Sequence, residues 1–202
     1  MKGIARQLMK DARAASAAEF AMVLPLLLLF IFGTIDVGRL MWTWNRAEKA
    51  TQMGARFAVV TNMVPATLAT QNFALSNGIP GGSPVPICGG TVTTNCFDTT
   101  SCDNVGCTNG WGYNAAAFSA VVGRMQLMMP TITAANVLID YENVGLGYAG
   151  DPNGPDVAPL VTVRLRNMTF RPISLFVFNG TFNLPDFRTA LTLEDGAGNV
   201  SN

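Results

Sequence analysis

Residues 15–35 read ASAAEFAMVLPLLLLFIFGTI, an apolar stretch that carries one charge, Glu19, near its start. The 16 residues from Phe20 to Ile35 are uncharged and would extend about 24 Å as a helix. Extending the helix back to Ala15 gives 21 residues and about 32 Å, which matches the roughly 30 Å hydrocarbon core of a bilayer. The sequence therefore predicts one membrane-spanning helix with Glu19 about one turn inside the apolar layer. Because an ionisable group is costly at that depth, we expect Glu19 to have a functional role and a partner.

The helix is expected to continue well beyond the apolar stretch. Small and apolar residues recur there at helical spacing, at Ala47, Ala50, Gly54, Phe57, Ala58 and Thr61. After the apolar stretch no helix breaker occurs before Pro65, so a single helix is predicted from about Ala15 to Met63. Such a helix would be more than 70 Å long, about half of it protruding from the membrane as a stalk.

Polar and aromatic residues follow the apolar stretch directly. Asp36 and Arg39 are three residues apart, so their side chains can form an ion pair at the membrane interface. Trp42 and Trp44 are aromatic residues of the kind that is enriched at that interface.

Residues 1–14 form a basic leader with Lys2, Arg6, Lys10 and Arg13 against the single acid Asp11. In an ordinary secretory signal peptide, the small residues of the cleavage site follow the apolar core. In this chain the small residues 14–18 precede the core instead. Cleavage there would remove the charges and leave the apolar helix on the mature protein, which is the order found in prepilin-type leaders.

The run AASAAEFAMVLPLLLLFIFGTIDVGRLMW, continued by NRAEKATQMGARFAV, resembles the TadE-like pseudopilins of tight-adherence (Flp-type) pili, which are type IV-like. The resemblance covers residues 13–60 and, more weakly, the C-terminal segment. It implies cleavage by a prepilin peptidase between Ala14 and Ala15, with Glu19 and Phe20 at the fifth and sixth mature positions. The sequence departs from the family pattern at Ala14, where glycine is usual.

The resemblance also implies a function and a set of partners. A TadE-like pseudopilin is a structural, minor component of pilus assembly and cell adhesion. Its expected partners are the bacterial inner membrane, other pilins and pseudopilins, the prepilin peptidase, and the assembly platform with its ATPase. A different interpretation of the same apolar helix is an uncleaved, single-span anchor of a surface or adhesive protein.

The position of Glu19 has a physical rationale that is independent of the family. Cleavage after Ala14 would place the new ammonium group of Ala15 one helical turn from Glu19 on the same face. That amine, or the amine of a neighbouring subunit, would neutralise a carboxylate that lipid cannot solvate. In related pilins the implied partner is the neighbour's amine, which sets the register during assembly. The alternative is that Glu19 lies at the headgroup boundary and merely ends the span.

All four cysteines, Cys88, Cys96, Cys102 and Cys107, cluster in one Gly-, Thr- and Asn-rich stretch. An even number of cysteines in such a loop region predicts two disulfides, with three possible pairings. A zinc site is the alternative, but the spacing contains no CxxC and the chain has no histidine. Disulfides indicate an oxidising compartment, so the distal region is expected in the periplasm. They also decide the topology, because the basic residues on the two sides of the span are nearly balanced.

The distal region is expected to combine a loop-rich segment with a helix and a small sheet. Residues 77–114 have no sustained period, whereas Ala115–Met129 is predicted to be helical and closed by Pro130. Alternation of apolar and polar residues predicts strands at Val137–Val144, Leu160–Arg166 and Thr189–Glu194, the last with Leu191 and Leu193 on the inner face.

The predicted fold class is therefore α+β and pilin-like, with a long N-terminal transmembrane helix packed on a small antiparallel sheet. Three parts are expected along the chain. Residues 1–14 form the leader, residues 15–63 form the transmembrane helix and its stalk, and residues 64–202 form an exported domain that holds the cysteine loops.

Residues 168–187 read MTFRPISLFVFNGTFNLPDF, with phenylalanines at Phe170, Phe176, Phe178, Phe182 and Phe187. Two roles for this apolar run remain open. It either covers the apolar face of the sheet or forms a surface that meets a partner subunit or the membrane.

Composition argues against several other functions. The chain has no histidine, and residues 57–202 hold five Lys/Arg against nine Asp/Glu, so nucleic-acid binding is not expected. No cofactor or metal is expected, because Asp151, Asn153 and Asp156 do not match a calcium-loop spacing. Asp140 and Glu142 share the presumed solvent face of a strand and are not expected to act as a catalytic pair. An enzyme would have to use carboxylates or free cysteines alone.

Overall fold

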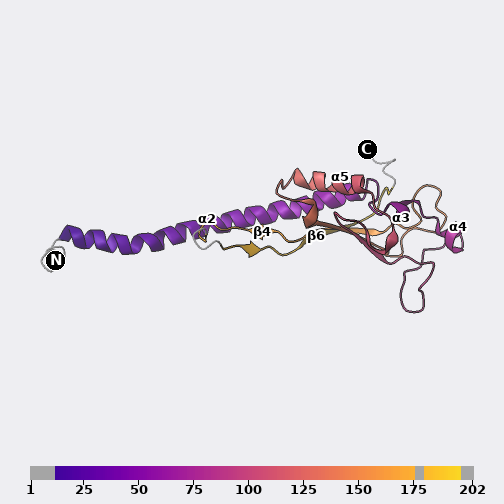
Figure 1. The fold of residues 1–202 in the computed structure, drawn as a ribbon, viewed down its shortest axis with the longest axis horizontal. Helices are drawn as coiled ribbons and strands as arrows, with labels where there is room; N and C mark the ends of the chain where they lie inside the picture. Colours follow the sequence, from indigo (N-terminus) through magenta and orange to yellow (C-terminus); the bar gives the residue numbers. More distant parts are fainter. Residues whose placement is uncertain (1–11, 176–179, 197–202) are drawn as a thin grey trace. The chain divides into compact units, whose positions relative to one another are not determined.

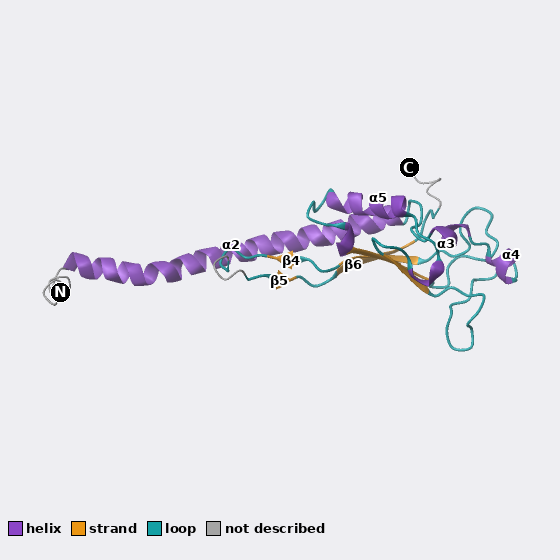
Figure 2. Cartoon of the chain, viewed as in Figure 1, coloured by secondary structure: helices purple, strands orange, loops and turns teal. Residues whose placement is uncertain are grey.

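The computed structural model describes residues 12–175 and 180–196, with side chains from Ser16 onward. The chain divides into two compact units, drawn in Figure 1 and coloured by secondary structure in Figure 2. Unit 1 comprises the described residues of Met1–Thr43 together with Thr169–Phe182, and unit 2 those of Trp44–Met168 and Asn183–Asn202. The elements in chain order are α2 (Ala12–Ala58), α3 (Ala66–Thr70), α4 (Phe73–Asn77), β1 (Thr99–Cys102), η1 (Thr108–Gly110), α5 (Ala115–Gln126), η2 (Ala134–Asn136), β2 (Val137–Glu142), β3 (Leu160–Leu165), β4 (Thr169–Phe170), β5 (Phe182–Asn183) and β6 (Phe187–Thr192). This combination of a long apolar helix and a small antiparallel sheet confirms the predicted α+β class.

The helix α2 ends at Ala58 rather than at the predicted Met63. Its last turn is followed by a run of β-branched residues, which lowers helix propensity. The Val59 carbonyl then accepts hydrogen bonds from the backbone N–H groups of Glu194 and Asp195, at 3.0 and 2.9 Å. A carbonyl at a helix end needs a partner, and here a distant part of the chain supplies it.

The sheet of unit 2 is antiparallel in the order β1-β2-β3-β6. Its inner face is formed by residues that alternate along β2 and β3, namely Val137, Ile139, Tyr141, Val161, Val163 and Leu165, all buried. These are the residues that strand periodicity assigns to one face. The prediction that Leu191 and Leu193 face inward is confirmed in part, because Leu193, which directly follows β6, is buried whereas Leu191 is 37 % exposed. Leu191 pairs with Val161 and so faces inward, but it lies on an edge strand with less cover.

The strand β1 was not anticipated, because it lies within the segment expected to be loop. It has only four residues and pairs with β2 from Thr99↔Glu142 to Cys102↔Ile139. Thr, Ser and Cys residues alone do not produce an alternating apolar pattern, so the pairing depends on β2.

The part of α2 in unit 2 lies between α5 and the sheet. Ala47, Ala50, Ala55 and Ala58 on this part are buried, which shows that small residues let the helix approach closely. A Cβ at Gly54 would lie within 3.3 Å of both Met125 of α5 and Val163 of β3. Figure 1 shows α5 running alongside this stretch of α2.

Two disulfides, Cys88–Cys96 and Cys102–Cys107, close loops in the segment between α4 and α5. The same segment is held by a buried amide, because Asn143 Nδ2 donates to the carbonyls of Val85 and Phe97 at 3.1 and 3.0 Å. Covalent and hydrogen-bonded links thus order a region that has little regular structure.

Candidate assembly site

The apolar half of α2 is exposed along the described residues of unit 1. Side chains such as Met22 and Leu26 are 82 % and 74 % exposed, and the other large apolar residues from Phe20 to Ile35 are also exposed, except Leu24, which is half-buried. By length and composition the helix from Ser16 to Ala58 is suited to cross a membrane. Since an apolar surface of this extent is unstable in water, it must be covered by lipid or by other proteins.

Glu19 and Phe20 both lie on this exposed surface, and Phe20 is 63 % exposed. Within the described residues Glu19 has no hydrogen bond or ion pair, so the partner expected for its carboxylate is not supplied by this part of the chain. Ala14 and Ala15, the expected cleavage site, have helical backbone, but their side chains lie outside the described part, as do leader residues 1–11.

Asp36 lies directly after the apolar stretch and is buried. Its carboxylate accepts two backbone hydrogen bonds, from the N–H of Ile173 to Oδ1 and from the N–H of Ser174 to Oδ2, each 2.7 Å long. Arg39 Nη1 donates to Oδ1 at 3.0 Å. The carboxylate of one helix residue thus neutralises an arginine and satisfies two donors of a distant segment.

Arg39 also contacts the residues that precede Ile173 in the chain. Its guanidinium lies 5.4 Å from the centroid of the Phe170 ring, and Nη1 also approaches the Arg171 carbonyl at 3.4 Å. A guanidinium over an aromatic face is an attractive arrangement. We refer to residues 169–174 as the strap, and to Asp36 and Arg39 with their contacts to it as the lock.

Sequence reasoning anticipated the Asp36–Arg39 pair, and the structure has it. It did not anticipate that Asp36 binds the strap. Asp36 accepts hydrogen bonds from backbone N–H groups there, and such groups do not depend on the residue type. The nearest signal is Pro172, which interrupts any strand that would otherwise continue from β4.

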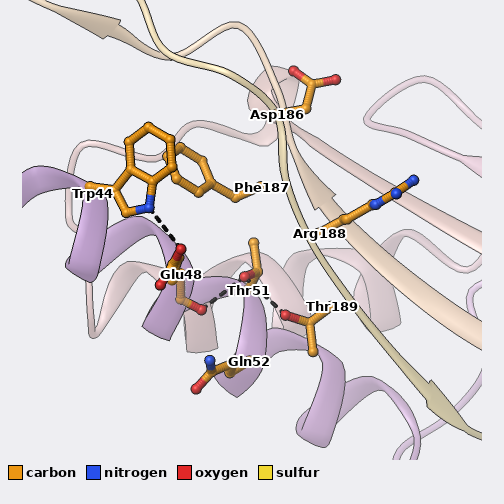
Figure 3. A pocket seen from close by; sticks show the side chains of 8 residues that line it. All are labelled: Trp44, Glu48, Thr51, Gln52, Asp186, Phe187, Arg188 and Thr189. Atoms are coloured by element: carbon orange, nitrogen blue, oxygen red, sulfur yellow. Dashed lines mark hydrogen bonds between the residues drawn. The ribbon is translucent and has the colours of Figure 1, made fainter.

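Trp44, one of the two aromatic residues expected at a membrane interface, packs within unit 2. Trp44 packs edge-on against Phe187 with ring centroids 5.0 Å apart, and its Nε1 donates to Glu48 at 2.7 Å (Figure 3). The indole is therefore held by β6, with both its ring and its N–H engaged. Trp42 is 68 % exposed.

A shallow groove of about 420 Å³ separates this part of α2 from β6. Figure 3 shows its lining, which comprises Trp44, Glu48, Thr51, Gln52, Asp186, Phe187, Arg188 and Thr189. Thr189 Oγ1 donates to Thr51 Oγ1 at 3.2 Å across its floor. None of these lining side chains is a thiol or an imidazole, and the arrangement does not pair a nucleophile with a base.

Asp140 and Asp156, two acids that were weighed as catalytic or calcium-binding residues from the sequence, make contacts that support the fold. Asp140 was expected on the solvent face of its strand, but it is buried. Ser101 Oγ donates to its Oδ1 at 2.6 Å, and Arg164 Nε lies 2.6 Å from its Oδ2. Asp156 accepts hydrogen bonds from the backbone N–H groups of Phe73 and Asp151, at 2.6 and 3.1 Å. Within the described residues, no group of three or more Cys, Asp or Glu side chains is placed to hold a metal ion.

The exposed apolar helix, the Glu19 position and the lock all fall in one N-terminal segment. Residues 14–56 match the family model of the TadE-like protein. This segment is TadE-like. No curated protein and no solved structure matches the chain.

The TadE-like segment contains Ala15, Glu19, Phe20 and both residues of the lock. The match covers 43 of the 202 residues and lies within the long N-terminal helix α2. That helix is compatible with a single membrane span.

Proposed function

We propose that the protein is a minor pseudopilin of a tight-adherence pilus, anchored in the bacterial inner membrane with its distal domain in the periplasm. A prepilin peptidase cleaves it between Ala14 and Ala15, and the mature helix then packs with the helices of other pilins. The observation that carries this proposal is the match of residues 14–56 to TadE-like proteins on a helix whose apolar side chains are exposed.

The assembly step is driven by burial of the apolar helix surface. In the membrane these side chains face lipid, and in a filament they face other helices. Van der Waals packing between helices, together with hydrogen bonds and ion pairs in a lipid-like environment, supplies the gain. The assembly platform and its ATPase are the expected source of the work that extracts the helix from lipid.

Glu19 gives the packing its register in this proposal. Cleavage creates an ammonium group at Ala15, four residues and about 6 Å along the axis from Glu19. When two subunits slide past each other, the Glu19 carboxylate of one reaches the amine of the other. An ion pair in a low-dielectric setting is strongly favoured over an unpaired carboxylate, so one axial offset is selected.

The two disulfides support the assignment of the distal domain to the periplasm. Cys88–Cys96 and Cys102–Cys107 use every cysteine of the chain. Disulfides persist in oxidising compartments and are reduced in the cytosol.

The test is to determine the N-terminus of the protein from membranes of a strain that assembles the pilus. We expect a mature chain that begins at Ala15 and lacks residues 1–14. An intact Met1 would contradict cleavage and would favour the alternative of an uncleaved anchor for a surface or adhesive protein.

A second experiment addresses Glu19 directly. Glu19→Ala is expected to leave membrane insertion unchanged and to abolish incorporation with the other pilins, measured by cross-linking and by pilus counts. Glu142→Gln is the matched control, because Glu142 is an exposed acid of unit 2. Normal assembly by Glu19→Ala would refute the role proposed for this carboxylate.

A further inference from the structure

The strap presents an unusual surface beside the end of the apolar helix. Ile173 is 44 % exposed and Phe182, also in unit 1, is 55 % exposed. Arg171 is exposed as well, and the side chain of Arg39 is 45 % exposed. Exposed apolar residues next to arginines form an amphipathic surface of the kind that binds at a membrane interface.

The backbone of the strap is adapted to a place with little water. Pro172 has no N–H, and the N–H groups of Ile173 and Ser174 are both bonded to Asp36. The Arg171 carbonyl receives Arg39 Nη1. Irregular backbone at the depth of a membrane requires such internal partners, because lipid offers none.

The charges of the strap surface also fit a membrane. Asp36 is buried and offsets the charge of Arg39, whereas Arg39 and Arg171 are both exposed residues, so the strap surface presents arginines rather than the acid. The other acid in the described part of unit 1, Glu19, is 17 residues earlier on the helix, about 25 Å away. Exposed arginines attract phospholipid phosphates, and more so when the lipids are anionic.

We propose that the strap is a second membrane contact, which lies in the outer interface of the bilayer and is held there by Asp36. Ile173 and Phe182 enter the boundary of the acyl chains, and Arg39 and Arg171 meet the phosphates. The contact fixes the depth of the helix, because the lock attaches the strap at the residue that follows the apolar stretch. This places Glu19 near the opposite boundary. The inference rests on the proposed membrane insertion.

The experiment uses the full-length protein in vesicles of phosphatidylcholine and phosphatidylglycerol with brominated acyl chains. Because all four native cysteines are in disulfides, one introduced cysteine gives a single site for a fluorescent label. The labelled positions are Ile173→Cys in the strap, Leu28→Cys in the apolar helix, and Leu75→Cys as a matched control. Leu75 is 86 % exposed in unit 2.

We expect bromine to quench the label at Ile173→Cys at least twofold more than the label at Leu75→Cys, and the label at Leu28→Cys most. Adding Asp36→Ala should reduce quenching at Ile173→Cys to the level of the control, with an intermediate effect for Asp36→Asn, which keeps one acceptor oxygen. Vesicles of phosphatidylcholine alone should reduce it in part, because the arginines lose the anionic headgroups.

Two results would overturn the inference and leave the proposed function intact. The first is an unquenched label at Ile173→Cys while the label at Leu28→Cys is quenched. The second is quenching at Ile173→Cys that neither Asp36 variant changes. If the label at Leu28→Cys is also unquenched, membrane insertion itself fails and the proposed function fails with it.

Discussion

Gly54 of α2 lies so close to Met125 of α5 that a Cβ at position 54 fits only if Met125 shifts. A Cβ at position 54 would be 2.7 Å from Met125 Cγ and 2.9 Å from its Sδ, and 3.3 Å from Cγ1 of Val163 in β3. The glycine is therefore what allows this part of the helix to lie between α5 and the sheet. The lack of room for a Cβ, rather than a need for backbone flexibility, explains the glycine at this position of the helix.

Gly54→Ala is expected to destabilise unit 2 by about 1–3 kcal/mol, because overpacking forces Met125 and its neighbours to shift. Gly123→Ala is the matched control, since Gly123 lies in the helix α5 with open space around its Cβ position. That substitution should stabilise the protein by about 0.5–1 kcal/mol through helix propensity. Thermal unfolding of both variants in detergent, followed by circular dichroism, checks the prediction. Equal effects in the two variants would contradict it.

Tyr141→Phe should cost about 1–3 kcal/mol at neutral pH. Tyr141 is fully buried, and its hydroxyl oxygen accepts a hydrogen bond of 3.2 Å from the backbone N–H of Val64. The variant keeps the ring but leaves that donor without its acceptor. The measurement is urea unfolding monitored by circular dichroism.

Tyr141 also makes the free energy of unfolding depend on pH. Burial raises the pKa of Tyr141 above its ordinary value, so the folded state keeps the phenolic proton where the unfolded chain releases it. The stability that this provides is complete below pH 10 and falls by up to about 1.4 kcal/mol per pH unit as pH rises above 10. The free energy of unfolding of the native protein should therefore decline more steeply than that of Tyr141→Phe between pH 9.5 and pH 11. Parallel slopes would show that another group is responsible.

Replacing Cys102 and Cys107 together by serine is expected to destabilise the protein by about 2 kcal/mol, because the loop that the disulfide closes is short. The effect should be local. β1 should lose protection from hydrogen exchange, since its Thr100 and Ser101 also bond to Thr108, the residue that directly follows Cys107. β3, which lies between β2 and β6, should keep its protection. Loss of protection in β3 as well would show that the disulfide supports the whole sheet.

Asp156→Ala should destabilise the region around α4 by about 2–3 kcal/mol, because a charged acceptor for two backbone N–H groups is removed. One of these donors is Phe73, the first residue of α4. Asp156→Asn retains one acceptor oxygen and should cost less. Limited proteolysis after residue 73 reports the change, and equal cleavage of the native protein and both variants would argue against this role.

Processing gives a functional prediction. Ala14→Gly introduces the residue that is usual in TadE-like proteins and should accelerate removal of the leader, whereas Ala14→Phe should block it. The fraction of cleaved protein in membranes, measured by its shift on a gel, distinguishes the variants. If Ala14→Phe is processed normally, the cleavage site lies elsewhere.

The elements whose residues carry their own periodicity could be predicted from the sequence. The apolar stretch before Asp36, the alternation in β2 and β3, and the residues of α5 between Ala115 and its closing turn all form the expected elements. Each reflects a local rule, that a helix or strand buries one set of side chains at a fixed spacing. The TadE-like character of the N-terminal segment was visible for the same reason, since its motif is contiguous.

Only the tertiary structure decided those features that depend on a partner from a distant position in the chain. The end of α2 at Ala58 depends on donors near residue 195, and β1 depends on β2. Asp36 was visible as the partner of Arg39, three residues away, but its bonds to the strap cross 137 residues of chain. A backbone N–H is the same group in every residue except proline, so no residue pattern announces which one a buried carboxylate will bind. The sequence by itself determined the long apolar helix and the elements that carry their own periodicity, and the folded chain determined which polar groups meet.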